Sequence, residues 1–282
     1  MLWLYHLRDW IFSRQHYWGE PIPIIHCEKC GEVPVPEDQL PVELPEVKSY
    51  EPTETGESPL ANITQWVKTE CPKCGGPGER ETDTMPNWAG SSWYYLRYTD
   101  PKNSDTLADS KKMKYWLPVD HYEGGSEHVT LHLLYSRFWH KFLYDIGIVP
   151  TPEPYQKRTI HGVVLGEDGS KMSKSLGNVI NPDDLIEEYG ADVVRAYMMF
   201  MSPYEGDVSW STETINGVKR FTAKFYRFLL SSYSEKAESS EKVTKAVARL
   251  VRRVERNILD FKFNTCISAL MEFYNEFHDT KL

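Results

Sequence analysis

The sequence lacks a long hydrophobic run. None of the apolar stretches in the 282 residues approaches the roughly 20 residues that span a membrane, and the aromatic first 20 residues are interrupted by Arg8, Asp9 and Arg14. No signal peptide or membrane anchor is readable. We therefore expect a cytoplasmic protein with no membrane partner.

The sequence also lacks an excess of positive charge. It has 41 acidic and 32 basic residues and a net charge of −9, so binding of nucleic acid across the whole surface is not expected. Residues 217–262, however, contain twelve Lys or Arg and five Asp or Glu, which is a local charge of +7. A basic stripe at helical spacing within this segment is either an RNA-binding face or merely the solvated side of a helix; it comprises Lys245, Arg249, Arg252 and Arg256.

Cysteine is scarce, and four of the five cysteines stand in two tight pairs. In a long chain of this character, two C-x-x-C pairs favour a metal site over disulfides. Four thiolates suit tetrahedral Zn²⁺ in a structural site, although about forty residues separate the pairs and imply an extended insertion. The predicted ligands are Cys27, Cys30, Cys71 and Cys74, and the fifth cysteine, Cys266, is expected in a helical core.

The pattern of apolar residues predicts an α/β fold followed by helices. Strands are expected over 21–25, 115–120 and 158–165, and helical stretches over 127–147 and 181–200, the second capped by Asn181. Beyond about residue 217 the chain is expected to be helical. One stripe there should face the core, namely Val243, Val247, Leu250, Val254 and Ile258.

The segment "GEDGSKMSKSLGN", residues 166–178, places two lysines on one glycine-containing turn. Lys171 and Lys174 are three residues apart and can both reach one polyanion, while Gly166 and Gly169 would let the loop close around it. The alternative is an ordinary exposed basic turn. A mobile phosphate clamp is the interpretation that we carry forward.

The "KMSKS" within this segment is typical of the class I aminoacyl-tRNA synthetases, and other segments extend that resemblance over nearly all 282 residues. These segments follow one another in the order found in bacterial-type leucyl-tRNA synthetases, which the chain resembles. The segments that carry the resemblance are "RDWIFSRQHYWGEPIPI", "MPNWAGSSWYYLRY", "YWLPVDHYEGGSEHVTLHLLYSRFWHKFLYDIG", "HGVVLGEDGSKMSKSLGNVINPDDLIEEYGADVVRAYMMFMSP" and "FKFNTCISALMEFYNEF".

The resemblance implies roles for particular positions. Lys171 and Lys174 would stabilise the triphosphate and the departing pyrophosphate of ATP, with Mg²⁺ sharing the charge. The resemblance implies ATP contacts by Gly124, Gly125, Glu127, His128, Val164, Leu165, Met172, Ser173 and Lys174.

An amino-acid pocket is implied around Ser92, Trp93, Tyr94, His128 and His132. The two histidines are four residues apart and should share a helix face, which by itself equally suits a metal pair or a hydrogen-bonded core pair. An aromatic run such as residues 92–94 is also more often core than pocket wall.

The resemblance implies a fold with four parts: a catalytic-domain segment over 1–25, a zinc-ribbon-like insertion over 26–80, the second half of a Rossmann-like parallel sheet over 81–216, and the start of a tRNA-binding helical bundle over 217–282. None of the nine histidines forms the His-x-Gly-His motif of the class. We therefore expect leucine activation and transfer to tRNA(Leu) with an upstream half on a separate chain, the alternatives being a noncatalytic RNA- or protein-binding module and a truncated longer enzyme.

Overall fold

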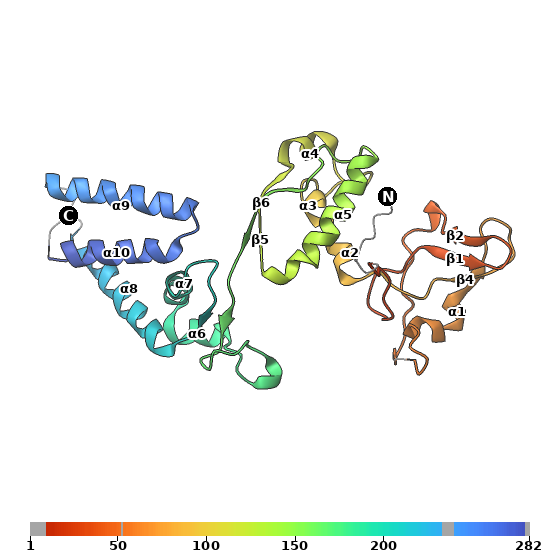
Figure 1. Ribbon diagram of the computed structural model, residues 1–282, viewed down its shortest axis with the longest axis horizontal. Coiled ribbons are helices and arrows are strands. Elements are labelled where there is room, and N and C mark those ends of the chain that lie inside the picture. The colour runs from red at the N-terminus through yellow and green to blue at the C-terminus, as the bar shows by residue number, and fades with distance from the viewer. Residues whose placement is uncertain (1–9, 52, 233–239, 280–282) are drawn as a thin grey trace, which may run out of the picture. The chain divides into compact units, whose positions relative to one another are not determined.

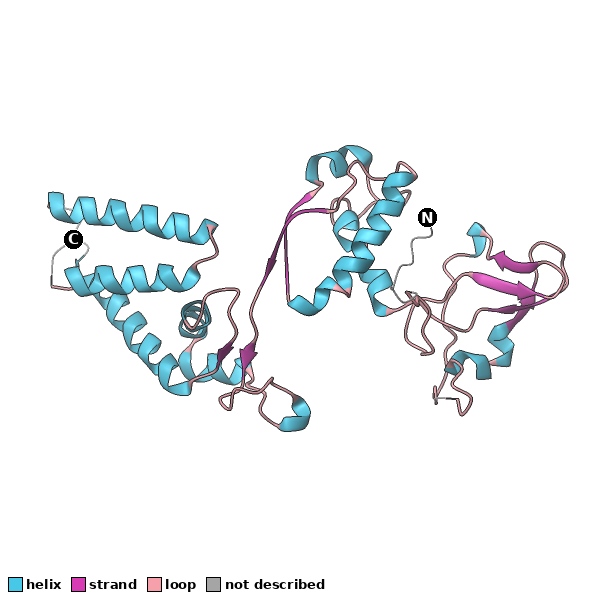
Figure 2. Ribbon diagram, in the orientation of Figure 1, coloured by secondary structure: helices cyan, strands magenta, loops and turns pink. Residues whose placement is uncertain are grey.

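The computed structural model describes residues 10–51, 53–232 and 240–279, which fall into two compact units (Figures 1 and 2). Unit 1 contains the described residues up to Tyr122 together with Glu127–Lys157, and unit 2 contains Glu123–Ser126 together with the described residues from Arg158 on. The expected helix or loop over the first residues falls partly on residues 1–9, outside this description. The domain boundaries at 25, 80 and 216 stay predictions.

A small antiparallel sheet organises the cysteine-containing part of unit 1. The strand expected at 21–25 begins only at Ile24, because Pro21 and Pro23 have no N–H to donate to a ladder. The strands, in the spatial order β2-β1-β4-β3, are β1 (Ile24–Cys27), β2 (Gly31–Pro34), β3 (Lys68–Glu70) and β4 (Pro77–Arg80), and the connection between β2 and β3 holds η1 (Glu37–Gln39), η2 (Pro59–Asn62) and α1 (Thr64–Val67).

Four helices and the amino-terminal parts of two paired strands form the rest of unit 1. The prediction of a strand over 115–120 was wrong in part: Tyr115 and Trp116 end a helix, and the strand starts at Val119. The elements are α2 (Asn87–Ser91), α3 (Tyr94–Arg97), α4 (Ser110–Trp116), β5 (Val119–Gly124), η3 (Ser126–Val129), α5 (His132–Asp145) and β6 (Tyr155–Ile160). Their core is Tyr95, Leu96, Ala108, Met113, Leu117, Leu143 and Val149.

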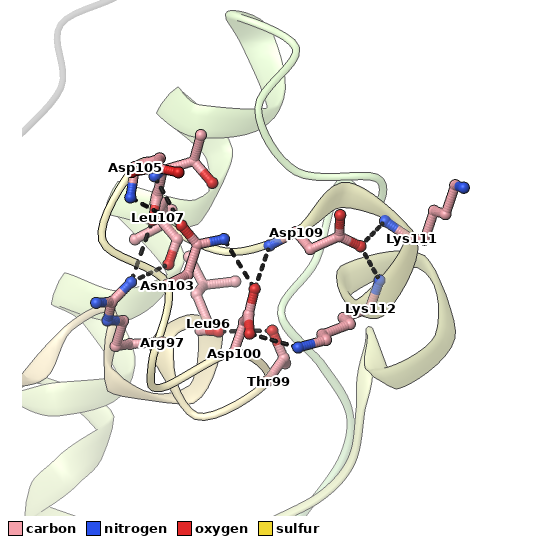
Figure 3. A network of polar contacts seen from close by, with 11 residues as sticks. Leu96, Arg97, Thr99, Asp100, Asn103, Asp105, Leu107, Asp109, Lys111 and Lys112 are labelled. Atoms are coloured by element: carbon pink, nitrogen blue, oxygen red, sulfur yellow. Dashed lines mark hydrogen bonds and ion pairs between the residues drawn. The ribbon is translucent and has the colours of Figure 1, made fainter.

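A nearly buried carboxylate fixes the loop between α3 and α4 (Figure 3). Asp100 accepts hydrogen bonds from Asn103 Nδ2 at 2.8 Å and from the backbone N–H of Asp109 at 3.1 Å, and it pairs with the ammonium of Lys112. Asp109 in turn caps α4 by accepting from the N–H of Lys111 and Lys112. This cap satisfies backbone N–H groups in the first turn and so favours a helix from Ser110 on.

After the end of β6, unit 2 contains a very short parallel pair, β7 (Val164–Leu165) and β8 (Val208–Ser209). The single strand expected over 158–165 is divided, because β6 ends at Ile160 and Gly162 packs directly against the backbone of Gly206. The helical stretch over 181–200 is likewise divided at Gly190, whose φ of +85° separates α6 (Pro182–Tyr189) from α7 (Ala191–Phe200). Asn181 caps α6 as predicted, accepting from the N–H of Asp183.

Three long helices complete unit 2: α8 (Thr212–Ser232), α9 (Glu241–Leu259) and α10 (Phe263–Phe277). Figure 1 shows α9 and α10 side by side, and the core between the helices contains Phe228, Val243, Phe273 and Phe277. The predicted apolar stripe of α9 is only partly correct. Val243 is buried and Leu250 packs on this core, but Val247 and Ile258 are 39% and 50% exposed, and α10 is the main neighbour of α9.

The fold is therefore α/β, as predicted, with a parallel strand pair beside a helical bundle. Cys266, on α10, is buried as predicted. Among the described residues, no helix combines the length and apolar character needed to cross a membrane.

Candidate functional site

The four paired cysteines converge on one point in unit 1. Their sulfur atoms all lie within 4.8 Å of one another, and Cys27 Sγ and Cys74 Sγ are 3.8 Å apart. A tetrahedral site with metal–sulfur bonds of about 2.3 Å has sulfur–sulfur edges of about 3.8 Å. The donor set and its spacing therefore fit Zn²⁺.

Local backbone geometry produces this convergence. Each second cysteine is followed by a glycine in the left-handed region, Gly31 with φ +74° and Gly75 with φ +69°. These glycines turn the chain back sharply, so that Cys71 accepts from the N–H of Gly75 and donates to Gly76 O, both at 2.8 Å.

The thiols affect one another's ionisation. Burial and the neighbouring thiols raise the pKa of Cys30 to about 12. Burial also opposes ionisation of Cys71, but the backbone N–H groups of Lys73 and Cys74 outweigh it and lower the pKa of Cys71 to about 7. A cation among the sulfurs would stabilise all four as thiolates, the form that binds metal.

His132 lies at the buried centre of the predicted amino-acid pocket in unit 1. Its Nε2 donates to Ser91 O at 2.9 Å, so its Nδ1 accepts from Tyr122 Oη at 2.8 Å. Burial lowers the pKa of His132, which keeps the ring neutral near pH 7. Because both nitrogens are used within the protein, a substrate can meet only the faces and edges of this ring.

His128 differs from His132 in that its Nδ1 is buried and has no hydrogen-bond partner in the described structure. The prediction that the two histidines share a helix face was wrong. His128 lies in η3, whereas His132 is the first residue of α5. The indole of Trp88 nevertheless contacts both, with ring centroids 5.4 Å from His128 and 6.4 Å from His132. An unpartnered buried nitrogen is a position at which a polar ligand atom can bind.

The three predicted wall residues divide by role. Ser92 is buried and donates to Ala89 O within its own turn, and Trp93 packs against the core of unit 1. Tyr94 is partly exposed, and its ring lies 5.5 Å from that of His132. Of the three, only Tyr94 is placed to contact a ligand beside the histidines. Trp88 also lies beside both histidines, and the sequence did not predict this because a single tryptophan carries no spacing signal.

The predicted ribose-binding segment follows β5. Glu127, in unit 1, has a side chain that is 60% exposed and reaches His128 Nε2 only at 3.9 Å. Gly124 and Gly125 belong to unit 2, where Gly125 O accepts from Arg158 at 3.2 Å. Glu127 therefore has a carboxylate available for a ligand hydroxyl.

The lysine-containing loop is anchored at its base in the core of unit 2. Val164 in β7 and Met172 both pack against the cluster around Tyr197 and Trp210. The backbone of Leu165 pairs with that of Lys171, and Leu165 O accepts from the N–H of Trp210 at 3.0 Å. The predicted adenine-side residues and the loop are thus joined by backbone hydrogen bonds.

Lys171 and Lys174 are both exposed, and within the described ranges neither ammonium makes an ion pair. Ser173 accepts from the N–H of Ser175 and so caps η4 (Lys174–Leu176), which contains the second lysine. The loop therefore presents two positive charges that form no ion pair among the described residues, above a base that is hydrogen-bonded to the core of unit 2, and this geometry suits a phosphate chain.

The basic stripe of α9 is exposed as predicted. Lys245 forms an ion pair with Glu241, and Arg256 Nε lies 4.0 Å from Asp260 Oδ2. Arg249 and Arg252 form no ion pair within the part of the chain that the structure describes. A cavity of about 360 Å³ adjoins the stripe and is lined by Arg252, Arg253, Arg256, Asn257, Asp260 and Lys262.

Comparison with known proteins identifies the class to which this fold and site belong. The family model for class I tRNA synthetases (I, L, M and V) matches residues 1–211, so the chain belongs to that family. The sequence is 57% identical over 275 residues to the leucine–tRNA ligase of Alkaliphilus oremlandii (strain OhILAs), an alignment that covers 98% of this chain and 34% of that protein.

Solved structures agree with this classification. The structure of Agrobacterium radiobacter K84 LeuRS in a ternary complex with tRNA and LeuAMS matches 96% of this chain and 37% of its own, with a TM-score of 0.87 and 37% identity. Mycobacterium tuberculosis methionyl-tRNA synthetase in complex with methionyl-adenylate matches 76% of this chain with a TM-score of 0.50 and 20% identity, which supports the fold alone. The chain spans about a third of the length of its leucine-specific relatives.

Proposed function

We propose that this chain takes part in the ATP-dependent activation of leucine to leucyl-adenylate and in transfer of leucine to tRNA(Leu). The observation that carries the proposal is the pair of exposed lysines, Lys171 and Lys174, which form no ion pair with any described residue and lie on a loop whose base is anchored in the core of unit 2. The 57% identity to a leucine–tRNA ligase supports leucine as the amino acid.

The proposed chemistry needs charge stabilisation and positioning rather than an enzyme nucleophile. The leucine carboxylate attacks the α-phosphorus of ATP in line, and negative charge passes to the departing pyrophosphate. The ammonium groups of Lys171 and Lys174 stabilise that charge as it develops. Mg²⁺ would enter with the phosphates and share their charge.

The substrate pocket is proposed in unit 1, beside Trp88, Tyr94, His128 and His132. The unpartnered Nδ1 of His128 would bind a polar atom of leucine or of the adenylate, and the neutral, fully bonded His132 would contribute only its ring. Glu127 would accept a hydrogen bond from a ribose hydroxyl. Leucine selectivity by such a pocket is limited, since one methylene is worth about 1–3 kcal/mol.

The four-cysteine centre is proposed as a zinc-ribbon-like structural site. The sulfur spacing supports Zn²⁺, and four protein ligands leave no open position for catalysis. None of the five cysteines forms a disulfide, and a four-thiolate metal site suits a reducing compartment, so we propose a cytoplasmic location.

We propose that polypeptide outside these 282 residues, either a separate chain or an upstream segment, supplies the rest of the active site, including a His-x-Gly-His motif and the other half of a Rossmann-like sheet. Its contact surface on this chain would be a stripe at every fourth residue, made of Leu134, Phe138 and Phe142 on α5 and of Ile146 directly after the helix, which are all exposed. So much aromatic and aliphatic surface on one helix is typical of a protein interface. Transfer of leucine would further require tRNA, for which the exposed stripe of α9 is the proposed contact.

The test is leucine-dependent exchange of pyrophosphate into ATP. The zinc-loaded chain is assayed alone and with a polypeptide that corresponds to the amino-terminal part of the leucine-specific relatives. Exchange is expected with both polypeptides together, reduced at least about a hundredfold by the double change Lys171→Ala and Lys174→Ala, as for removal of a transition-state contact. Removal of two other exposed charges, Lys102→Ala with Lys111→Ala, should leave it unchanged.

Association is measured in the same mixtures. The change Phe138→Glu should prevent co-elution of the two polypeptides while the circular dichroism of this chain stays the same. A folded, zinc-loaded chain that yields no exchange in any mixture but binds RNA would instead be a noncatalytic RNA-binding module derived from a synthetase.

A further inference from the structure

Asn178, which follows the lysine-containing loop, makes hydrogen bonds on both sides of Met172. Its Oδ1 accepts from the backbone N–H of Ser173 at 2.8 Å. Its Nδ2 donates to Ser170 Oγ at 2.8 Å and approaches Lys171 O at 3.4 Å. One side chain thereby holds the segment that contains Lys171 and leads into Lys174.

Asp168 completes this arrangement from the other end of the loop. Its carboxylate accepts from the backbone N–H of Ser170 at 3.0 Å and from Ser170 Oγ at 2.8 Å. Three side chains are thus linked in a chain of hydrogen bonds: the amide of Asn178 donates to the hydroxyl of Ser170, and this hydroxyl donates to the carboxylate of Asp168. We call Asp168, Ser170, Ser173 and Asn178 the loop clasp.

Glycine at position 166 is needed for the loop clasp to close. Gly166 is buried, and its N–H donates to Ser170 O at 2.8 Å. A Cβ atom there would lie 2.7 Å from Asp168 Oδ1 and 3.1 Å from Asn178 Nδ2. This glycine therefore serves close packing in addition to the loop flexibility that its presence suggests.

We propose that Asn178 is a positioning residue that holds the two lysines in the arrangement required to bind one polyphosphate. The role given to the lysines rests on the proposed function. The hydrogen bonds by which Asn178 restrains the loop do not depend on that function. Asn178 acts through the backbone: its Oδ1 fixes Ser173, Ser173 caps η4, and η4 contains Lys174. On the other side, Ser170 and the carbonyl of Lys171 are fixed by its Nδ2.

The restraint is tested by limited trypsin digestion, with mass spectrometry of the fragments. Trypsin cleaves after Lys171 and Lys174, and cleavage requires that the loop leave its folded conformation. Asn178→Ala should accelerate cleavage at these two bonds about tenfold, as expected for the loss of one or two net hydrogen bonds. The matched control is Asn181→Ala, which removes an asparagine cap three residues away and should leave both rates unchanged.

Coupling to the lysines is tested by a double-mutant cycle in the pyrophosphate exchange assay, with both polypeptides present. Asn178→Ala alone should lower kcat about tenfold, but it should have little further effect once Lys171 and Lys174 are alanine, because its action passes through them. A purely structural role predicts equal effects in both backgrounds, and that result would overturn the proposal.

The two experiments separate the restraint from the proposed function. Faster cleavage in Asn178→Ala with no exchange in any sample supports the loop clasp and counts against leucine activation by these polypeptides. Unchanged cleavage in Asn178→Ala, with the chain folded, refutes the loop clasp whatever the exchange assay shows.

Discussion

A methyl group added at Gly162 has no free space to occupy. The Cβ atom of Gly162→Ala would lie 2.1 Å from Gly206 O, 2.3 Å from Gly206 C and 2.8 Å from the backbone nitrogen of Asp207. All three are backbone atoms, which cannot rotate away as a flexible side chain can. The segments around residues 162 and 206 must therefore move apart by more than about 1 Å to restore an ordinary contact.

That displacement acts on a specific set of hydrogen bonds. The N–H of Gly162 donates to Tyr204 O at 2.9 Å, the N–H of Val163 to Asp207 Oδ1 at 2.7 Å, and the N–H of Val208 to Val163 O at 3.1 Å. Forcing an extra methyl group into a packed site costs typically 1–3 kcal/mol, and strain in these three bonds places Gly162→Ala at about 3 kcal/mol. The parallel pair β7 and β8 should loosen with it.

Gly217 provides the matched control. It lies within α8, and a Cβ atom there would meet nothing within 4 Å. Gly217→Ala should therefore stabilise unit 2 by about 0.5–1 kcal/mol, since alanine loses less backbone entropy than glycine in a helix. The same Gly→Ala substitution is thus expected to destabilise unit 2 at position 162 and to stabilise it at position 217.

Native-state hydrogen exchange is the suitable assay, because a chain of two units does not unfold as one two-state system. Peptides that cover residues 159–166 and 203–210 should exchange about a hundredfold faster in Gly162→Ala, while peptides from unit 1 stay unchanged. Equal exchange rates in Gly162→Ala and the wild type would show that this close approach is absent in solution and would refute the reasoning.

Three further predictions follow from other parts of the molecule. Metal chelation or Cys71→Ser should release one equivalent of Zn²⁺ and unfold the β1–β4 sheet without changing exchange in unit 2, as read by metal analysis and peptide-resolved hydrogen exchange. The hydrogen bonds from Lys112 and Asn103 lower the pKa of Asp100 from 3.8 to about 2. Because the folded pKa is depressed, the stabilisation that Asp100 contributes is present above pH 3.8 and disappears as the pH falls toward 2. Asp100→Asn should therefore remove this acid-dependent loss of stability from thermal melting curves of unit 1. In the α9 stripe, the double change Arg249→Ala and Arg252→Ala should weaken tRNA binding and reduce the magnitude of its log–log salt slope by about 1–2, measured by titration at several salt concentrations.

Local spacing was sufficient to predict several features. Each C-x-x-C pair is confined to one turn with a following glycine, so local geometry holds the two sulfur atoms of a pair close together, and only the meeting of the two turns is a tertiary contact. Asn181 caps its helix because the bond it accepts comes from two residues away. The exposed lysine pair and the buried Cys266 likewise follow from short-range pattern.

Features that depend on contacts distant in sequence were predicted less well. Tyr115 and Trp116 resemble a strand, but they end α4, a helix whose Met113 is buried in one core with Leu143 and Val149. Val247 and Ile258 fit an apolar stripe, yet their burial depends on which neighbour packs on α9. The roles proposed for the ATP and tRNA residues stay predictions.

The sequence by itself determined the chemistry that is available: a four-thiolate centre, two lysines three residues apart, and a class I synthetase pattern that its relatives confirm. The tertiary structure decided how those groups are held. It made His132 a fully bonded neutral ring, left His128 Nδ1 without a partner among the described residues, and placed Asn178 across the lysine loop. The reason is physical: the sequence specifies which polar atoms exist, but whether an atom is bonded or left unpaired depends on what folds against it.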